Sequence, residues 1–382
     1  MLPMSLPAFS FPRWLGALLL VAVLLVLATA WWTWPRAVPA PAGLGPATAY
    51  QTTSPTGPPP ADGRMRGVSW VGTDSASMLD LAPLTNAGVT WIAQMPFGWQ
   101  AGAAEPAVQL RPNVASRRYW GESDAGILLT AQRAKERGIR TLLKPHLWLR
   151  GPGSWSGDIN MNSEADWQTW FSSYSVFILH YARLAETGKL DALCIGTELE
   201  RTVGHEAEWR KLIRQIRQVY HGPLTYAANW SGEFEQVRFW DALDFIGVQA
   251  YFPLSPQPSP DKASLLAAWQ EPLRRLEAIQ KKYNKPVVFT EAGYKTTADA
   301  AAKPWEWPRQ TDMLTPADEA TQAACYAALF ETFWPRPWFK GLFIWKWYPG
   351  LRPDGPARRH ADFTPQHKPA EQVMSAWFLK RG

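Results

Sequence analysis

Short apolar runs alternate with amphipathic stretches from residue 65 to the end of the chain. The runs are rich in β-branched and aromatic residues, which is typical of buried strands. They lie at residues 66–71, 89–95, 140–146, 192–198, 224–229, 245–251, 287–291 and 342–347. Between them, apolar residues recur at helical spacing over residues 124–137, 164–184, 206–220, 262–282 and 317–334. Strands that alternate with helices in this way predict an α/β fold, a single (β/α)8 TIM barrel over residues 65–382.

The N-terminal segment has a different pattern. Residues 14–34 carry no charge and end in Trp31, Trp32 and Trp34, so they predict a transmembrane signal anchor behind a tail at residues 1–13. A cleaved signal peptide is the alternative, because Ala28 and Ala30 form a small-residue cleavage pattern. Residues 35–64 are rich in proline and glycine and predict a linker. We therefore expect contact with a membrane through the N-terminal segment and a folded domain outside the cytoplasm, periplasmic or extracellular, anchored or secreted.

Composition excludes several classes of function. The net charge is +6, but the basic side chains are scattered, so we expect no nucleic-acid partner. The 2 cysteines, Cys194 and Cys325, cannot form a disulfide framework or a set of zinc fingers, and their apolar surroundings predict buried thiols. The 23 tryptophans indicate flat apolar surfaces that could stack on sugar rings. We expect a monomer that needs no metal and no cofactor.

Two glutamates stand at the ends of predicted strands. Glu198 closes the fourth apolar run and Glu291 closes the seventh. Because functional residues of such a barrel lie at the carboxyl ends of its strands, both side chains should converge on one mouth. Two carboxylates in one cleft are what cleavage of a glycosidic bond requires. Glu200 is a rival to Glu198, since residues two apart share one face of a strand.

The segments around these glutamates resemble clan A of the glycoside hydrolases, which are retaining enzymes on (β/α)8 barrels. IGTELE at 195–200 and FTEAGY at 289–294 are most similar to family 113, the β-mannanase family. FIGVQAY at 245–251 and DFTPQHKPA at 362–370 add to the resemblance, which covers residues 65–382. The resemblance implies that Glu198 is the acid/base, that Glu291 is the nucleophile, and that the substrate is a β-1,4-linked mannan. The clan usually has asparagine before the acid/base, in contact with the sugar 2-hydroxyl, whereas this chain has Thr197.

Other residues at the strand ends are candidates for binding the substrate. The resemblance implies that the Tyr251 hydroxyl orients Glu291. The remaining candidates are polar or aromatic residues near strand ends or in the long segments that follow them: Thr197, His146, Asn229, Trp230, Trp148, and Trp345 with Trp347 as its alternate on the same strand face. Glu233 and Glu235 are interpreted instead as charges in the first turn of a helix.

The sequence therefore predicts a retaining glycoside hydrolase that acts on a β-linked polysaccharide or oligosaccharide, with mannan as the first choice. A hydrolase or transglycosylase of the same clan that acts on another β-glycan is the first alternative. A barrel without catalytic activity that binds glycans at the cell surface is the second.

Overall fold

The computed structural model describes residues 61–110, 117–151, 154–309, 312, 316–353 and 361–380. The predicted anchor at 14–34 and most of the predicted linker at 35–64 lie outside these residues. Among the residues that are described, no helix is long and apolar enough to cross a membrane.

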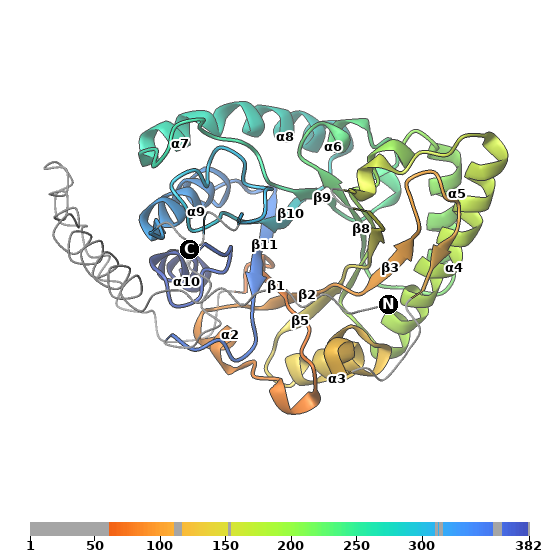
Figure 1. Ribbon diagram of the computed structural model, residues 1–382, viewed down its shortest axis with the longest axis horizontal. Helices are drawn as coiled ribbons and strands as arrows, with labels where there is room; N and C mark the ends of the chain where they lie inside the picture. Colours follow the sequence, from red (N-terminus) through yellow and green to blue (C-terminus); the bar gives the residue numbers. More distant parts are fainter. Residues whose placement is uncertain are drawn as a thin grey trace, which may run out of the picture. The chain divides into compact units, whose positions relative to one another are not determined.

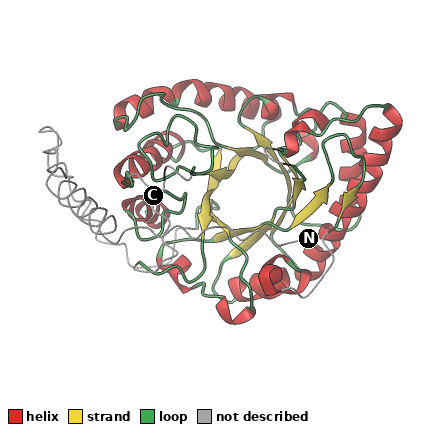
Figure 2. Cartoon of the chain, viewed as in Figure 1, coloured by secondary structure: helices red, strands yellow, loops and turns green. Residues whose placement is uncertain are grey.

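Eight parallel strands form a closed barrel in the order β1-β11-β10-β9-β8-β7-β5-β2. Figure 2 shows them as a ring with helices around the outside. Each strand lies within a few residues of a predicted apolar run, so the predicted barrel is confirmed. The strands are β1 (Met65–Trp70), β2 (Trp91–Gln94), β5 (Arg140–Leu143), β7 (Ala192–Thr197), β8 (Leu224–Asn229), β9 (Ile246–Gln249), β10 (Val287–Ala292) and β11 (Phe339–Trp347).

Helices follow most of the strands and cover the outside of the barrel (Figure 1). The α-helices are α2 (Ala82–Asn86), α3 (Asp124–Lys135), α4 (Glu164–Gly188), α5 (Glu206–Arg217), α6 (Glu233–Gln236), α7 (Lys262–Ala268), α8 (Gln270–Tyr283), α9 (Glu319–Phe333) and α10 (Pro369–Leu379). The short 3-10 helices are η1 (Ala76–Met78), η2 (Arg117–Glu122), η3 (Ser156–Asp158), η4 (Glu200–Thr202) and η5 (Trp240–Ala242).

Two of the predicted helices differ from the observed ones. The stretch 262–282 forms α7 and α8, because Pro272 has no N–H to bond the carbonyl of Ala268, where α7 ends. The stretch 317–334 forms α9, which begins at Glu319 rather than at residue 317. Asp318 caps α9, because its carboxylate accepts a hydrogen bond from the N–H of Thr321 at 2.8 Å.

A small second sheet lies outside the barrel and was not predicted from the sequence. It contains β3 (Phe97–Gln100), β4 (Val108–Gln109) and β6 (His146–Leu149) in the order β4-β3-β6. The predicted third strand, 140–146, therefore ends earlier than expected, at Leu143, and His146 begins β6. Because β3 follows β2 and β6 follows β5, this sheet stands at the carboxyl end of the barrel.

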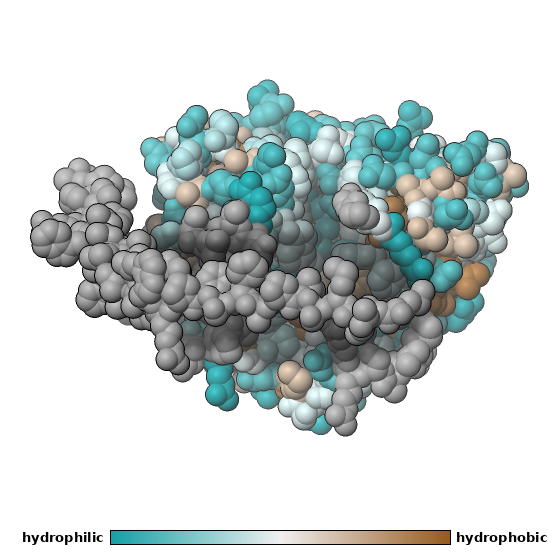
Figure 3. Space-filling view, in the orientation of Figure 1, coloured by the Kyte–Doolittle hydropathy of each residue, from teal (hydrophilic) through white to brown (hydrophobic). Residues whose placement is uncertain are grey.

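Apolar side chains fill the barrel and the layer between barrel and helices. Trp91, Leu142, Val288 and Phe343 belong to the cluster inside the barrel, and Cys194 and Cys325 are buried free thiols as predicted. The visible part of the described surface is mostly hydrophilic, with apolar residues gathered at the right-hand edge on the side of α4 (Figure 3). The burial of apolar area thus stabilises a rigid ring whose strand ends can hold polar groups in fixed positions.

Closure of the ring between β1 and β11 requires glycine at position 341. Gly341 pairs with Met65, has φ of +124°, and a Cβ there would overlap the Met65 carbonyl. We expect Gly341→Ala to lower the free energy of unfolding by about 3 kcal/mol, measured by urea unfolding. Gly138→Ala is the control: it also has positive φ, +73°, but open space around it, and should cost about 1 kcal/mol. Equal losses in the two variants would contradict the overlap.

Candidate active site

A cavity of about 840 Å³ opens at the carboxyl ends of the strands and contains both glutamates. Its walls come from the ends of β7, β8, β9, β10 and β11 and from the loops that follow β6, β8, β10 and β11. The lining residues are Ser154, Trp155, Glu198, Asn229, Trp230, Ser231, Tyr251, Glu291, Trp305, Glu306, Trp307, Trp345 and Phe363. Glu198 and Glu291, which are 93 positions apart in the sequence, therefore meet in one cavity. They do so because all strands of the barrel have their carboxyl ends at the same mouth.

Glu198 follows the last residue of β7 in a left-handed conformation, with φ of +50°. A glutamate there is disfavoured by about 1–2 kcal/mol and persists only where surrounding contacts hold it. The backbone N–H of Glu198 donates to the Ala227 carbonyl at 2.9 Å, which fixes the turn. As a result the chain leaves the strand before Glu200, which begins η4 and does not line the cavity. The argument that Glu198 and Glu200 share a strand face is therefore wrong.

The carboxylate of Glu198 accepts two hydrogen bonds. The Trp155 indole donates to Oε2 at 3.0 Å, and the Asn229 amide donates to Oε1 at 2.7 Å. Burial raises the pKa of Glu198 to about 7, and the negative charge of Glu291 acts in the same direction, against the two hydrogen bonds. At neutral pH this carboxyl can therefore both donate and accept a proton.

Glu291 has the opposite electrostatic environment. Burial by itself would raise its pKa, but the charge and hydrogen bond of the Lys144 ammonium beside Oε1, together with neighbours that include the Gln249 side chain, lower the pKa of Glu291 overall. Tyr251 donates its hydroxyl to Oε2 at 2.7 Å. Lys144 is fully buried and also donates to the Thr290 carbonyl at 3.2 Å. Glu291 is thus an ionised, oriented carboxylate.

His146 lies close to the Lys144–Glu291 pair. Its Nε2 is 3.8 Å from Oε1 of Glu291, beyond hydrogen-bond distance. Burial, and then the charge of Lys144, lower the pKa of His146 to about 3, so the imidazole is neutral at neutral pH. His146 borders the nucleophile position without adding charge to it.

A third glutamate supports the asparagine that bonds Glu198. Glu233 is completely buried and accepts hydrogen bonds from the backbone N–H of Asn229 at 2.6 Å and from the Tyr226 hydroxyl. Burial raises the pKa of Glu233 to about 8, against these hydrogen bonds. Glu233 and Glu235 both lie in the first turn of α6, as interpreted from the sequence, but Glu233 is buried, whereas Glu235 is exposed and pairs with Arg275 at 2.6 Å.

Tryptophans form the outer wall of the cavity. Trp230 stacks on Trp305 with ring centroids 5.0 Å apart, and Trp307 meets the edge of Trp345 at 6.2 Å. Trp305 and Trp307 are 41% and 56% exposed, so their faces are accessible to a ligand. The ammonium of Lys346 lies 4.4 Å from the centroid of Trp307, which restrains that ring.

The structure brings four of the predicted substrate-binding residues to the cavity and leaves four outside its lining. Asn229, Trp230, Tyr251 and Trp345 line it. The other four have different surroundings: Thr197 and Trp347 are buried, His146 is beside Glu291, and Trp148 is exposed on β6. Their contact with substrate stays a prediction.

Two tryptophans that line the cavity, Trp305 and Trp307, were not singled out from the sequence. The only signal for them was their position after the seventh strand, in a segment with no periodic pattern. The contacts of Lys144 with Glu291 and of Glu233 with the N–H of Asn229 were not predicted either.

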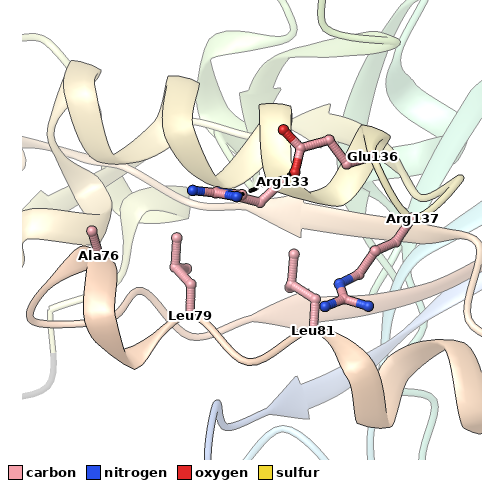
Figure 4. Close-up of a pocket in the computed structure, with 6 residues that line it drawn as sticks. All are labelled: Ala76, Leu79, Leu81, Arg133, Glu136 and Arg137. Atoms are coloured by element: carbon pink, nitrogen blue, oxygen red, sulfur yellow. Dashed lines mark hydrogen bonds and ion pairs between the residues drawn. The ribbon is translucent and has the colours of Figure 1, made fainter.

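A second cavity, of about 450 Å³, is lined by η1, the segment before α2, and the end of α3 (Figure 4). Its walls are Ala76, Leu79, Leu81, Arg133, Glu136 and Arg137, and Arg133 pairs with Glu136 at 3.4 Å. It contains one carboxylate, already paired, so it lacks the two-carboxylate arrangement of the first cavity. Within the described part of the chain, no group of three or more His, Cys, Asp or Glu side chains could hold a metal ion.

Comparison with known proteins is consistent with this geometry. A sequence model described as Glycoside Hydrolase Family 113 matches residues 66–378. The GH113 β-mannanase AaManA from Alicyclobacillus acidocaldarius, in complex with ManMIm, is 30% identical, with a TM-score of 0.71 over 82% of this chain and 97% of that one. Another structure, a complex of a GH113 β-1,4-mannanase, is 26% identical, with a TM-score of 0.70 over 83% and 99% of the two chains. No curated protein sequence matches significantly.

We expect Lys144→Met to raise the pKa of Glu291 above its ordinary value, because burial then acts without an opposing cation. The measurement is a pH titration of the glutamate carboxyl carbons by ¹³C NMR. Lys346→Met is the matched control, since Lys346 is also buried but lies 4.0 Å from Asp362. An unchanged titration of Glu291 in the Lys144 variant would show that the ion pair does not set its charge.

We expect Glu233→Leu to lower the free energy of unfolding by about 3 kcal/mol, because it leaves the Asn229 N–H and the Tyr226 hydroxyl buried without an acceptor. Glu235→Leu, two residues away, removes only a surface ion pair and should cost less than about 1 kcal/mol. Both values come from chemical denaturation. Similar losses would place Glu233 among ordinary helix charges.

Proposed function

The chain belongs to glycoside hydrolase family 113, and from that membership we propose that it cleaves β-1,4-linked mannan with retention of configuration, Glu291 acting as nucleophile and Glu198 as acid/base. The enzyme class follows from the family. The substrate and the roles of the two glutamates are proposed from the cavity and from the mannanases that the chain resembles, which are 26% and 30% identical.

One observation carries the assignment of roles: the two carboxyls share a cavity but have pKa values shifted in opposite directions. A retaining glycosidase needs one carboxylate that is ionised and one carboxyl that still holds its proton at working pH. Lys144 and Tyr251 favour the ionised form of Glu291. Burial and the charge of Glu291 favour the protonated form of Glu198.

In the first step, Glu291 Oε attacks the anomeric carbon while Glu198 gives its proton to the leaving glycosidic oxygen. The covalent bond to the sugar removes the negative charge of Glu291. Because that charge helps to raise the pKa of Glu198, the pKa of Glu198 falls when the intermediate forms. Glu198 can then take a proton from water, which attacks the anomeric carbon and releases Glu291.

The remaining cavity suits a chain of sugar rings. Trp230, Trp305, Trp307 and Trp345 offer flat apolar faces around the two carboxyls, and sugars present C–H groups to such faces while their hydroxyls remain solvated. Thr197 is buried and does not line the cavity, so the amide of Asn229, which already reaches Glu198, is the better candidate to contact a sugar hydroxyl. A different β-glycan remains the alternative substrate.

Because residues 14–34 are predicted to anchor the chain in a membrane, we propose that the reaction takes place outside the cytoplasm. The proline-rich segment 35–64 would then hold the barrel away from the membrane. A polysaccharide too large to enter the cell would be accessible to a barrel in this location.

We expect Glu291→Gln to lower kcat on mannan by about 10⁴-fold or more, and Glu198→Gln to lower it by about 10²- to 10⁴-fold. The loss in Glu198→Gln should be smaller on an aryl glycoside whose leaving group needs no proton. In the wild type, kcat/KM should fall as pH rises past about 7, where Glu198 loses its proton, and this limb should be absent in Glu198→Gln.

The assay uses the full-length protein on a panel of β-glycans, with NMR of the first product to read the anomer. Hydrolysis of another β-glycan, lost in both variants, would keep the mechanism and replace mannan as the substrate. A first product of inverted configuration, or full activity in either variant, would refute the two-step mechanism.

A further inference from the structure

The small sheet β4-β3-β6 has one buried and one accessible face. In β3, Gly98 and Gln100 are buried, whereas Phe97 and Trp99 are partly accessible. In β6, Leu147 and Leu149 are buried, whereas His146 is partly accessible and Trp148 is 54% exposed. Since side chains alternate along a strand, the accessible face consists of the four rings Phe97, Trp99, His146 and Trp148.

The buried face fixes this sheet against α4. A Cβ at Gly98 would overlap the ring of Phe177, so the strand approaches the helix as closely as glycine permits. Gln100 accepts a hydrogen bond from the indole of Trp170 at 3.0 Å. The rings on the other face are therefore carried by a rigid support, which lowers the entropy that a ligand would otherwise lose on ordering them.

The four rings are in mutual contact. β3 and β6 are parallel and pair Phe97 with His146 and Trp99 with Trp148. Ring centroids are 5.4 Å apart for Phe97 and His146, 6.0 Å for Phe97 and Trp148, and 6.2 Å for Trp99 and Trp148. The result is a continuous aromatic surface.

This surface begins at the nucleophile. His146 Nε2 is 3.8 Å from Glu291 Oε1, and Trp148 follows two residues later on the same strand face, roughly 7 Å farther along. Apart from Trp155, in the loop after β6, the tryptophans of the main cavity wall come from the ends of β8 and β11 and the loop after β10. A glycan bound across Glu291 would therefore meet aromatic rings at both ends.

We propose that Phe97, Trp99 and Trp148, which we name the aromatic platform, form an outer subsite that binds the sugars of a β-glycan chain beyond those held in the main cavity. The inference rests on the proposed function and adds a preference for long chains. A sugar chain fits better than a protein or a nucleic acid, because the face carries neutral rings at all four positions and begins beside Glu291 of the main cavity.

The test compares kcat/KM of the full-length protein on soluble mannan with kcat/KM on mannotriose. We expect Trp148→Ala to lower the value for mannan about 3- to 10-fold more than the value for mannotriose, since stacking on one ring is lost only for the long chain. Trp148→Tyr retains a ring and should restore most of the difference. Val176→Ala is the control, because Val176 is an apolar side chain on α4 that is 64% exposed, and it should leave both values unchanged.

Equal changes for the two substrates in Trp148→Ala, or no change for either, would overturn the platform. If the wild type hydrolyses no mannan, the proposed substrate is wrong, and glycan binding then tests the aromatic platform. In that case we compare the electrophoretic mobility of Glu291→Gln, with and without Trp148→Ala, in gels that contain soluble β-glycans. Retardation that Trp148→Ala weakens supports the platform, and retardation that it leaves unaltered, or no retardation by any glycan, refutes it.

Discussion

The ion pair between Lys144 and Glu291 crosses the barrel. In the ring of strands, β5 and β10 are separated by β9, β8 and β7 on one side and by β11, β1 and β2 on the other, so the two residues come from opposite walls. The pair can form only when the ring is closed. Removal of two charges from water is costly unless they meet each other and further hydrogen-bonding groups, and here Tyr251, Gln249 and the Thr290 carbonyl complete the set.

The same region holds two buried acids with raised pKa values, and these lower the stability of the folded protein at high pH. Glu198 and Glu233 keep their protons in the folded state up to about pH 7 and 8. Each raised pKa contributes folding stability that is fully present below pH 4.5, the ordinary pKa of glutamate. This contribution is lost as pH rises through the pKa that the residue has in the folded state. Buried carboxyl groups that stay protonated at neutral pH thus make the active site a locally destabilised part of an otherwise apolar barrel.

Aromatic side chains have two separate uses in this protein. Many lie in the core, where Trp209, Trp240 and Trp269 are fully buried and supply packing area. Others are held at the mouth by neighbours that leave one face open, as Lys346 does for Trp307. A high tryptophan content alone does not separate these uses, since an indole serves equally well in either environment.

The sequence by itself determined the barrel, because apolar runs of strand length alternate with amphipathic helices. It also placed Glu198 and Glu291 at one mouth, because parallel strands end on the same side of a barrel. Only the tertiary structure decided that Lys144 meets Glu291, that Glu233 is buried beside Asn229, that Trp345 and not its alternate Trp347 lines the cavity, and that Trp305 lines it as well. These outcomes depend on contacts between residues far apart in the chain, 147 positions for Lys144 and Glu291, and on loops whose paths no local periodicity encodes.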